Sequence, residues 1–462
     1  MTVITRIAPS PTGDLHIGTA RTALFNWLWA QHTQGQFLIR VEDTDQKRHS
    51  DNAVQTILEG LNWLGLNSSA APTFQSQRQA RHIEVAQQLY QSGHAYYCTC
   101  TPEDVEAMRE QARKNGQIPK YNGRCRNASH TQGVLRFKMP TSGQSTLHDQ
   151  VQGTITIDNS QFDDFVLLRA DGTPTYLLAV VVDDHDMYIS HVIRGDDHIN
   201  NTFKQVPLYQ AMGWDVPAFA HIPLIHGPDG HKFSKRHGAP SILAYRDQGF
   251  LPQAMFNYLL KLGWSHGDDE IISQAQAIKW FSLDNLNKSP ARFDMEKLRF
   301  INTHYLRAMD PSALMQVLAP FLEKQLGRPL NSSEADRIQF GLPHLTQRAE
   351  TLVELADTSL IYTNSPPTPT ETEQALLTPE ALKHLNALKE KFTALEAWNK
   401  EALTEIVKIY LADHGLKMPE IGKPLRVALT GRLNAPGLYD ILETLGHAEA
   451  LSRLNKIAPP SS

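Results

Sequence analysis

The pattern of apolar and polar positions at the start of the chain predicts a β-strand, a tight turn and a helix. Residues 3–8 alternate between two faces, and the alternation stops at Pro9 and Pro11, after which a helix is expected to begin at His16. An apolar run at 37–41 and the helical spacing that follows Ser50 repeat this order. Such alternation predicts a parallel α/β sheet, which binds ligands at the carboxyl ends of its strands.

The pattern changes twice further along the chain. From about 97 to 172 it shows short strands with glycine and proline turns, and the α/β pattern resumes at 192–194. Beyond about 240 the spacing is helical, and the amphipathic stretch 403–411 is predicted to end at Gly415. The fold class predicted is α/β, a Rossmann-type parallel sheet split by an α+β insertion and followed by all-helical C-terminal domains. The expected domains are residues 1–96 with 173–240, residues 97–172, residues 241–305, and residues 306–462 with a subdivision near the proline-rich run 364–372.

Composition bounds the class of protein. A chain of 462 residues exceeds the size of a single core, so about two to four domains are expected. The start M-T-V-I-T-R has no signal-peptide pattern, and no apolar run approaches a membrane span, so a cytoplasmic protein without a membrane partner is expected. Three cysteines are too few for a disulfide framework and fit a reducing compartment.

The net charge of −5 counts against a nucleic-acid partner but does not exclude one. Residues 109–126 hold six lysines and arginines against one glutamate, which is a local basic stretch. The structural alternative is a solvated helix face.

Two segments carry residues suited to binding ATP. His16 and Gly18 open the first predicted helix, where exposed amides favour anionic oxygens and a glycine admits close approach to the backbone. Lys232 and Lys235 lie in the second segment, K-F-S-K-R, on a polar loop, and a lysine there could follow a phosphate whose charge grows as a bond breaks. For His16 the structural alternative is a helix-capping histidine.

These segments resemble the HIGH and KMSKS motifs of class I aminoacyl-tRNA synthetases. The ordered set resembles the bacterial glutamyl-tRNA synthetases over nearly the whole chain: P-S-P-T-G-D-L-H-I-G, R-V-E-D-T-D, V-V-V-D-D, V-I-R-G-D-D-H and K-F-S-K-R-H-G-A. Thr19, Phe233 and Arg236 depart from the general motifs without removing either lysine. The resemblance implies an ATP site made by Pro9, His16, Gly18, Lys232, Ser234 and Lys235.

The resemblance also implies ATP-dependent ligation of L-glutamate to tRNA(Glu) by a monomer. Mg²⁺ would enter with ATP, and glutamyl-adenylate would form, with release of pyrophosphate, before a ribose hydroxyl of the tRNA attacks it and AMP leaves. His16, Lys232 and Lys235 would stabilise charge on the phosphates. Residues 97–172 would lie near the acceptor end of the tRNA, 241–305 near its stem and 306–462 near its anticodon.

Glutamate carries two carboxylates and one ammonium, so its pocket needs two cations and an anion. Arg6 and Arg194 offer guanidinium forks, and Glu42 can accept from the ammonium. Ser10 and Tyr176 match positions of the family's pocket. Spacing alone leaves open which arginine takes which carboxylate, and the resemblance favours Arg6 for the side chain. The structural alternative for either arginine is an ion pair with Asp43, Asp45, Asp183 or Asp184.

Cys98, Cys100 and Cys125 lie close enough in sequence to form a structural Zn²⁺ site, which prefers four N or S ligands. Some relatives place a histidine where this chain has Asn127, and others use a tyrosine that matches Tyr121. His130 is a further candidate for the fourth ligand. The alternative is three free thiols.

Other functions are compatible with parts of the sequence. A non-discriminating enzyme that also charges tRNA(Gln) is the nearest alternative, and a small-molecule nucleotidyltransferase or a non-catalytic tRNA-binding paralogue would belong to different classes. Arg348, in the predicted helical run 347–352, is the candidate for reading anticodon position 36, which is C in tRNA(Glu) and G in tRNA(Gln).

Overall fold

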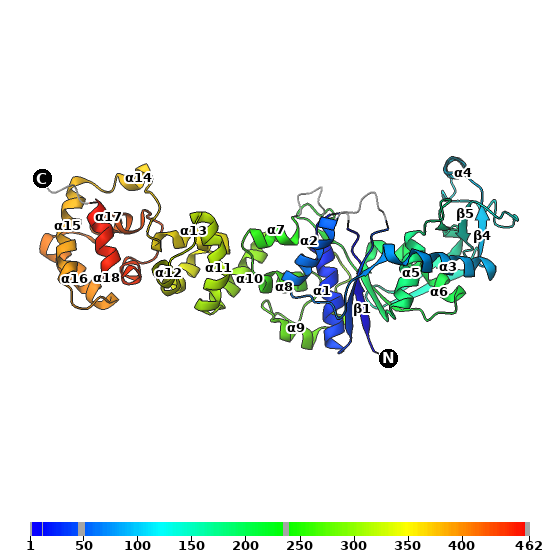
Figure 1. The fold of residues 1–462 in the computed structure, drawn as a ribbon, viewed down its shortest axis with the longest axis horizontal. Coiled ribbons are helices and arrows are strands. Elements are labelled where there is room, and N and C mark those ends of the chain that lie inside the picture. The colour runs from blue at the N-terminus through cyan, green and yellow to red at the C-terminus, as the bar shows by residue number, and fades with distance from the viewer. Residues whose placement is uncertain (1, 12, 45–50, 234–239, 458–462) are drawn as a thin grey trace. The chain divides into compact units, whose positions relative to one another are not determined.

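A computed structural model describes residues 2–11, 13–44, 51–233 and 240–457. The chain forms two compact units, Met1–Tyr245 with Met255–Met295, and Arg246–Ala254 with Glu296–Ser462. Figure 1 shows the elements of each unit. The finer domain limits predicted from sequence stay a prediction.

A parallel sheet forms the centre of the first unit. One part has the order β1 (Ile4–Ile7), β2 (Gln36–Val41), β3 (Thr73–Phe74), all parallel. The other has the order β7 (Gly153–Asp158), β6 (Gln144–Asp149), β10 (Ala218–Ile222), β9 (His191–Gly195), in which only β7 is antiparallel to its neighbour. Ser190 joins the two parts, because its amide donates to the Ile4 carbonyl at 3.0 Å and its hydroxyl accepts from the Ile4 amide at 2.8 Å.

Helices follow the strands as the sequence pattern predicts. They are α1 (Ile17–His32), α2 (Asp51–Trp63), α3 (Gln79–Gln91), α5 (Tyr176–Asp186) and α6 (Ile199–Ala211), with short 3-10 turns η1 (Gln75–Arg78), η2 (Asn159–Gln161) and η3 (Asp196–His198). Ser50, the predicted cap of α2, lies outside the described residues. The chain leaves β1 toward β2 and leaves β9 toward β10, so the sheet order reverses between β1 and β9. Ligands of open α/β sheets bind at such a switch point.

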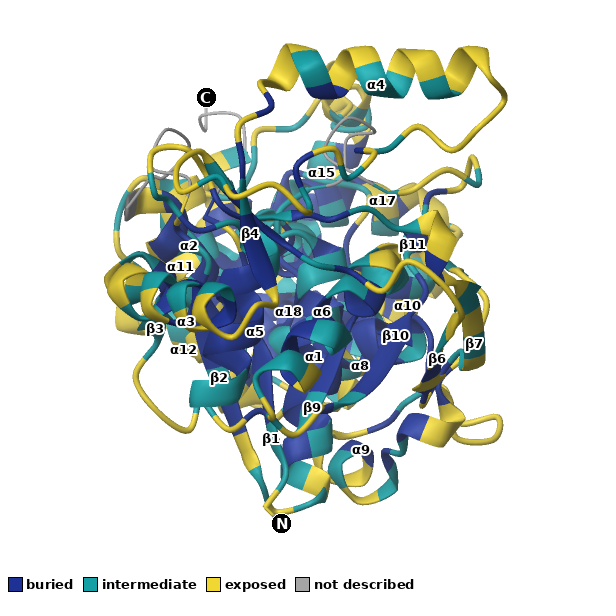
Figure 2. Ribbon diagram, turned by 90° about the vertical axis from the view of Figure 1, so that its right-hand side faces the viewer, coloured by how far each residue is buried: buried dark blue, intermediate teal, exposed yellow. Residues whose placement is uncertain are grey.

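The predicted insertion contains a second, smaller sheet. Its antiparallel order is β4 (Ala95–Cys98), β5 (Val134–Phe137), β8 (Val166–Leu168). Helix α4 (Pro102–Lys114) begins with a capping box between Thr101 and Asp104 and buries only Val105, and Figure 2 shows it as largely exposed. Strands β6 and β7 also fall within 97–172, but β6 pairs with β10 of the parallel sheet.

The remaining elements near residue 240 are short. β11 (Ile225–His226) pairs with β12 (Ala291–Arg292), a parallel ladder that the sequence pattern did not predict. The helices are α7 (Ile242–Asp247), α8 (Pro252–Lys261) and α9 (Gln274–Trp280), with the 3-10 turn η5 (Leu283–Asn285).

The second unit has no strand among its described residues. Its helices are α10 (Met295–Ala308), α11 (Pro311–Leu326), α12 (Ser332–Leu345), α13 (Leu352–Ser359), α14 (Glu371–Gln374), α15 (Pro379–Thr393), α16 (Lys400–His414), α17 (Met418–Thr430) and α18 (Leu438–Ile457), with η6 (Thr346–Arg348) and η7 (Leu360–Tyr362). Gly415 ends α16 in the left-handed conformation, at φ 66°, as predicted. No helix in the described part of the chain is long and apolar enough to span a bilayer.

The predicted helical pattern also fails at Arg348. The predicted run 347–352 is wrong, since Arg348 closes the 3-10 turn η6 and α13 begins only at Leu352. Thr351 caps α13 by accepting from the Glu354 amide, and this cap interrupts the helix. The fold class predicted from sequence is otherwise confirmed.

Candidate active site

A cavity of about 520 Å³ opens at the carboxyl ends of β1, β2 and β9, at the switch point of the sheet. Its wall contains nine of the residues that the sequence singled out: Arg6, Pro9, Ser10, His16, Gly18, Glu42, Tyr176, Arg194 and Lys232. Ser234 and Lys235 lie outside the described residues. Tertiary structure therefore brings together side chains separated by more than 200 positions.

His16 is both the N-cap of α1 and part of the cavity wall. Its Nδ1 accepts from the Thr19 amide at 3.3 Å, and its Nε2 lies 3.0 Å from the Thr19 hydroxyl. A Cβ atom at Gly18 would lie 3.3 Å from the His16 ring, closer than most side-chain contacts, so glycine leaves room for the ring. The capping role and the position in the cavity therefore occur together, and Thr19 completes the cap.

Lys232 lies on the loop that follows β11. Its Nζ donates to the Asp197 carboxylate at 3.0 Å, and both side chains are about half exposed. An ion pair this exposed contributes little to stability and is readily exchanged for another anion. The ammonium group is therefore available to another anion in the cavity.

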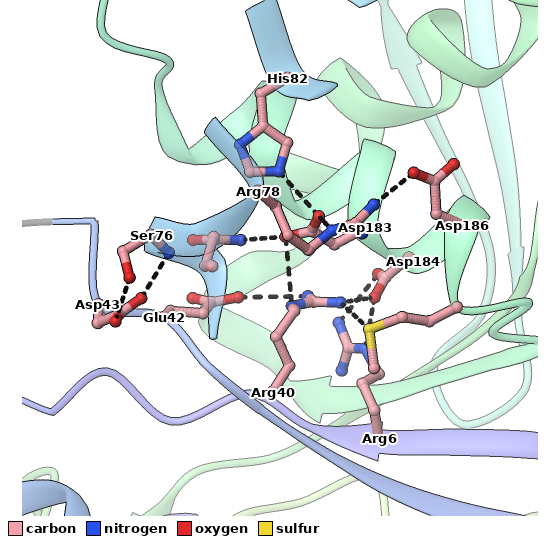
Figure 3. A network of polar contacts seen from close by, with 12 residues as sticks. Arg6, Arg40, Glu42, Asp43, Ser76, Arg78, His82, Asp183, Asp184 and Asp186 are labelled. Carbon is pink, nitrogen blue, oxygen red and sulfur yellow. Dashed lines mark hydrogen bonds and ion pairs between the residues drawn. The ribbon is translucent and has the colours of Figure 1, made fainter. Parts of the chain in front are cut away.

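Arg6 and Arg40 share one buried carboxylate, that of Asp184 (Figure 3). Arg6 uses Nε and Nη2, at 3.0 and 3.2 Å, and Arg40 donates from Nη1 at 2.5 Å. Burial alone would raise the pKa of Asp184, but the two guanidiniums outweigh it and lower that pKa to about 2. The structural alternative for Arg6, an ion pair with Asp184, is therefore present, while Nη1 of Arg6 has no hydrogen-bond partner among the described residues.

The network continues from Asp184 to its neighbour Asp183. The Asp183 carboxylate accepts from Arg78 at 2.6 Å and from Gln75 at 2.8 Å, and lies 2.8 Å from Nε2 of the buried His82. Arg78 also pairs with Asp186. These side chains come from η1, α3 and α5, and Arg6 and Arg40 reach Asp184 from β1 and β2 (Figure 3), so five elements hold the Arg6 end of the cavity.

Glu42 and Tyr176 supply polar groups beside the arginines. Burial raises the pKa of Glu42, and the charge of the Arg40 guanidinium, 3.3 Å away, opposes this rise. Burial, followed by the Glu42 charge, raises the pKa of Tyr176 to about 12. The Tyr176 hydroxyl lies 3.3 Å from Nδ1 of His198, whose own pKa is lowered to about 4 by burial and by Arg194.

Arg194 differs from Arg6 in its charge balance. Its side chain is buried and its neighbours are neutral: Nη2 donates to Thr202 at 2.6 Å and to Gln205 at 2.7 Å. Nη1 is buried without a hydrogen-bond partner, and Arg194 makes no ion pair within the described residues. Burial lowers the pKa of Arg194, so the site favours an incoming anion.

Among the wall residues that sequence reasoning did not single out are the polar residues Asp197 and His198. Both belong to the run V-I-R-G-D-D-H and form the turn η3 directly after β9. Their position just beyond a strand end was the signal that could have identified them, because functional side chains of parallel sheets lie there.

The three cysteines meet in the insertion, away from this cavity. Their sulfurs lie within 4.8 Å of one another, all are buried, and the Cys100 and Cys125 sulfurs are 3.5 Å apart. A tetrahedral zinc at 2.3 Å from each sulfur would separate them by about 3.8 Å. The Tyr121 hydroxyl lies 3.4 Å from the Cys98 sulfur, whereas Asn127 is exposed and His130 does not join the cluster among the described residues. Three buried thiols this close together could hold a metal ion.

Arg348 lies in the second unit. Its side chain is exposed, and its Nη1 donates to the Asn434 side chain at 2.9 Å. The charge of Arg348 adds to burial in lowering the pKa of Arg426, so a second cation lies nearby.

The cavity at the switch point of the sheet is lined by a helix N-terminus, a lysine and two buried arginines, which are groups that can hold anionic ligands. Comparison with known families identifies the class. Residues 2–300 match the model described as tRNA synthetases class I (E and Q), catalytic domain, and residues 313–458 match an anticodon binding domain. The chain belongs to the class I aminoacyl-tRNA synthetases of this E and Q family.

Individual relatives agree with the family. The chain is 50% identical to glutamate–tRNA ligase 2 of Rhodospirillum centenum, covering 98% of this chain and 99% of that protein. It is 49% identical to glutamate–tRNA ligase 2 of Paramagnetospirillum magneticum, covering 98% and 97%. A solved structure of a glutamate tRNA ligase from Elizabethkingia meningosepticum, in complex with its amino acid, superposes with a TM-score of 0.87 at 31% identity, covering 99% of each chain.

Asp184→Asn should destabilise the first unit by about 3–5 kcal/mol, since it leaves the Arg6 and Arg40 guanidiniums buried without their counter-charge. The control change Asp269→Asn, at a side chain 52% exposed, should cost less than about 1 kcal/mol. Urea unfolding of the three proteins at neutral pH measures both effects. Equal costs for the two variants would contradict the central role of Asp184.

The effect of Asp184→Asn on the free energy of unfolding should depend on pH. The pKa of Asp184 is depressed below its usual 3.8, so its stabilising contribution is complete above that value and is lost as the pH falls toward about 2. The stability gap between the unmodified protein and Asp184→Asn should therefore narrow on acidification through this window.

Proposed function

We propose that this protein ligates L-glutamate to tRNA(Glu) with ATP, through a glutamyl-adenylate, and releases AMP and pyrophosphate. The observation that carries the proposal is the buried Arg194 guanidinium, which has no ion-pair partner among the described residues and lines a cavity that also holds Arg6 and Glu42. Two cations and one anion match the two carboxylates and the ammonium of glutamate. Membership of the E and Q family limits the amino acid to glutamate or glutamine.

The amino acid would be held by five residues, Arg6, Ser10, Glu42, Tyr176 and Arg194. Arg6 and Arg194 each take one carboxylate, and the family resemblance favours Arg6 for the side chain. Glu42 accepts from the ammonium group. Glutamine would leave one desolvated guanidinium facing a neutral amide, a loss of several kcal/mol that supports discrimination of roughly 100- to 10,000-fold.

ATP would enter as its magnesium complex and lie across the N-terminus of α1, against Pro9, His16, Gly18, Lys232, Ser234 and Lys235. The α-carboxylate of glutamate attacks the α-phosphorus in line, and pyrophosphate leaves. His16, the helix amides and the two lysines stabilise the charge that develops on the phosphates. A ribose hydroxyl of the terminal tRNA adenosine then attacks the mixed anhydride, so no protein nucleophile is needed.

A structural zinc ion is part of the same proposal. Cys98, Cys100, Cys125 and Tyr121 would hold it, and the ion would fix the loops between β4 and β5. The helical unit would read the anticodon, with Arg348 at position 36. The enzyme would act as a monomer in the cytoplasm.

The decisive experiment is aminoacylation of tRNA(Glu) and tRNA(Gln) with glutamate and with glutamine. Charging of tRNA(Glu) with glutamate alone supports the proposal. Glutamate on both tRNAs would identify a non-discriminating enzyme, and no charging at all would overturn the catalytic assignment.

Lys235→Ala should lower the rate of glutamate activation by roughly 100- to 1,000-fold with little change in KM for glutamate, because this charge acts as pyrophosphate departs. The control is Lys279→Ala, an exposed lysine on α9 outside the cavity wall, which should leave the rate unchanged. Steady-state kinetics separates the two parameters. A rise in KM alone would remove Lys235 from the catalytic step.

Purified protein should contain about one zinc per chain, and Cys100→Ser should release it. Tyr121→Phe should weaken zinc binding, whereas His130→Ala should leave the zinc content unchanged. Elemental analysis of protein prepared without chelators measures all four samples. Metal-free unmodified protein would favour three free thiols.

Arg348→Gln should relax the preference for C over G at anticodon position 36 by ~1–3 kcal/mol, because a cationic donor suits the O2 and N3 acceptors of cytosine. Glutamyl-adenylate formation should not change. Arg348→Lys keeps the charge but not the fork, and should retain part of the preference. Charging kinetics on tRNAs that differ only at position 36 gives the comparison, and an unaltered preference in Arg348→Gln would contradict the assignment.

A further inference from the structure

Arg194 contacts His221, which forms a buried pair with Asp149 outside the cavity wall. Arg194 Nε donates to His221 Nε2 at 3.3 Å, and His221 Nδ1 lies 2.6 Å from the Asp149 carboxylate. Both Asp149 and His221 have fully buried side chains. They come from the end of β6 and from β10, strands that pair with each other, while Arg194 is on β9, which pairs with β10 on its other side.

These contacts fix where the imidazole proton lies. A guanidinium N–H can only donate, so His221 Nε2 must accept and must carry the lone pair. The proton then lies on Nδ1, where it donates to Asp149. The contacts of Thr202 are consistent with this position of the proton. Its hydroxyl oxygen accepts from Arg194 Nη2 and lies 2.9 Å from His221 Nε2, to which the hydroxyl can donate. Burial, acting against Asp149, lowers the pKa of His221 and favours this neutral form.

Asp149 is itself held in place by the backbone. Its Oδ1 accepts from the amides of Val151 and Gln152 at 3.0 and 2.8 Å, and the His221 amide lies 3.1 Å from both carboxylate oxygens. The tight turn between β6 and β7 thus orients the carboxylate, the carboxylate orients the imidazole, and the imidazole orients the guanidinium.

We propose that Asp149 and His221 are positioning residues for substrate binding, which hold Arg194 so that its free Nη1 points to a carboxylate of the amino acid. The proposal rests on the proposed function. Three of the five N–H groups of Arg194 are engaged by His221, Thr202 and Gln205, and no carboxylate competes for the guanidinium among the described residues. A neutral acceptor in this position fixes the geometry without neutralising the charge that the substrate needs.

Asp149→Asn tests the proton arrangement with little change of shape. The amide oxygen can keep the turn contacts with Val151 and Gln152, but the amide nitrogen would donate to His221 Nδ1 and force the proton to Nε2. The N–H group on His221 Nε2 would then face the N–H group on Arg194 Nε, and the hydrogen bond between the two residues would be lost. KM for glutamate should rise about 10- to 100-fold, with KM for ATP unchanged and kcat changed less than KM.

The matched control is Asp158→Asn, an exposed aspartate at the end of β7 that accepts from the Ser160 amide. It should leave all three constants unchanged. A variant that only loosened the fold would alter KM for ATP and the melting temperature along with KM for glutamate, and that result would overturn the proposal.

Two substitutions at His221 separate the two ring nitrogens. His221→Gln can present an oxygen near the position of Nε2 and so keep an acceptor for Arg194, whereas His221→Asn can keep the contact with Asp149 but not the acceptor. The glutamine variant should therefore retain a lower KM for glutamate than the asparagine variant. Equal KM values for the two variants, or the reverse order, would contradict the proposal. Absence of glutamate activity in the unmodified enzyme would instead contradict the proposed function itself.

Discussion

The buried carboxylate of Asp184, shared by the guanidiniums of Arg6 and Arg40, is the interaction on which the cavity depends. It joins β1, β2 and α5 at the point where the sheet order reverses. Two arginines this deeply buried would be costly without a counter-charge, and one carboxylate cannot neutralise both. The surplus positive charge is balanced in part by Glu42, and Nη1 of Arg6 keeps N–H groups without a hydrogen-bond partner among the described residues.

Arg194 completes the cavity by a different physical route. It has no ion pair within the described residues and is held by neutral groups, His221, Thr202 and Gln205. An anion in the cavity would therefore be attracted by the uncompensated charge of Arg194, whereas the charge of Arg6 is already paired with Asp184. Arg6, whose charge is largely compensated by Asp184, therefore contributes mainly a fixed hydrogen-bond geometry, and Arg194 contributes mainly uncompensated charge. Together they suit a substrate with two carboxylates.

Much of the site could be predicted from the sequence because its residues belong to local patterns. His16 follows a strand and a proline turn, so its place at a helix N-terminus was predictable from its neighbours alone. The fold class was predictable for the same reason, because alternating strands and helices admit few arrangements. Arg348 shows the limit, since apolar spacing cannot detect the Thr351 cap that ends the predicted run.

The sequence by itself determined the alternation of strands and helices around the cavity, the residue types at the strand ends and the resemblance to the family. Only the tertiary structure decided which charges meet. Asp184 pairs with Arg6 across 178 positions and Asp149 meets His221 across 72, and several aspartates were equally available to either arginine by spacing. Such pairings depend on which strands become neighbours and on how far each group is buried, and no local pattern encodes either quantity.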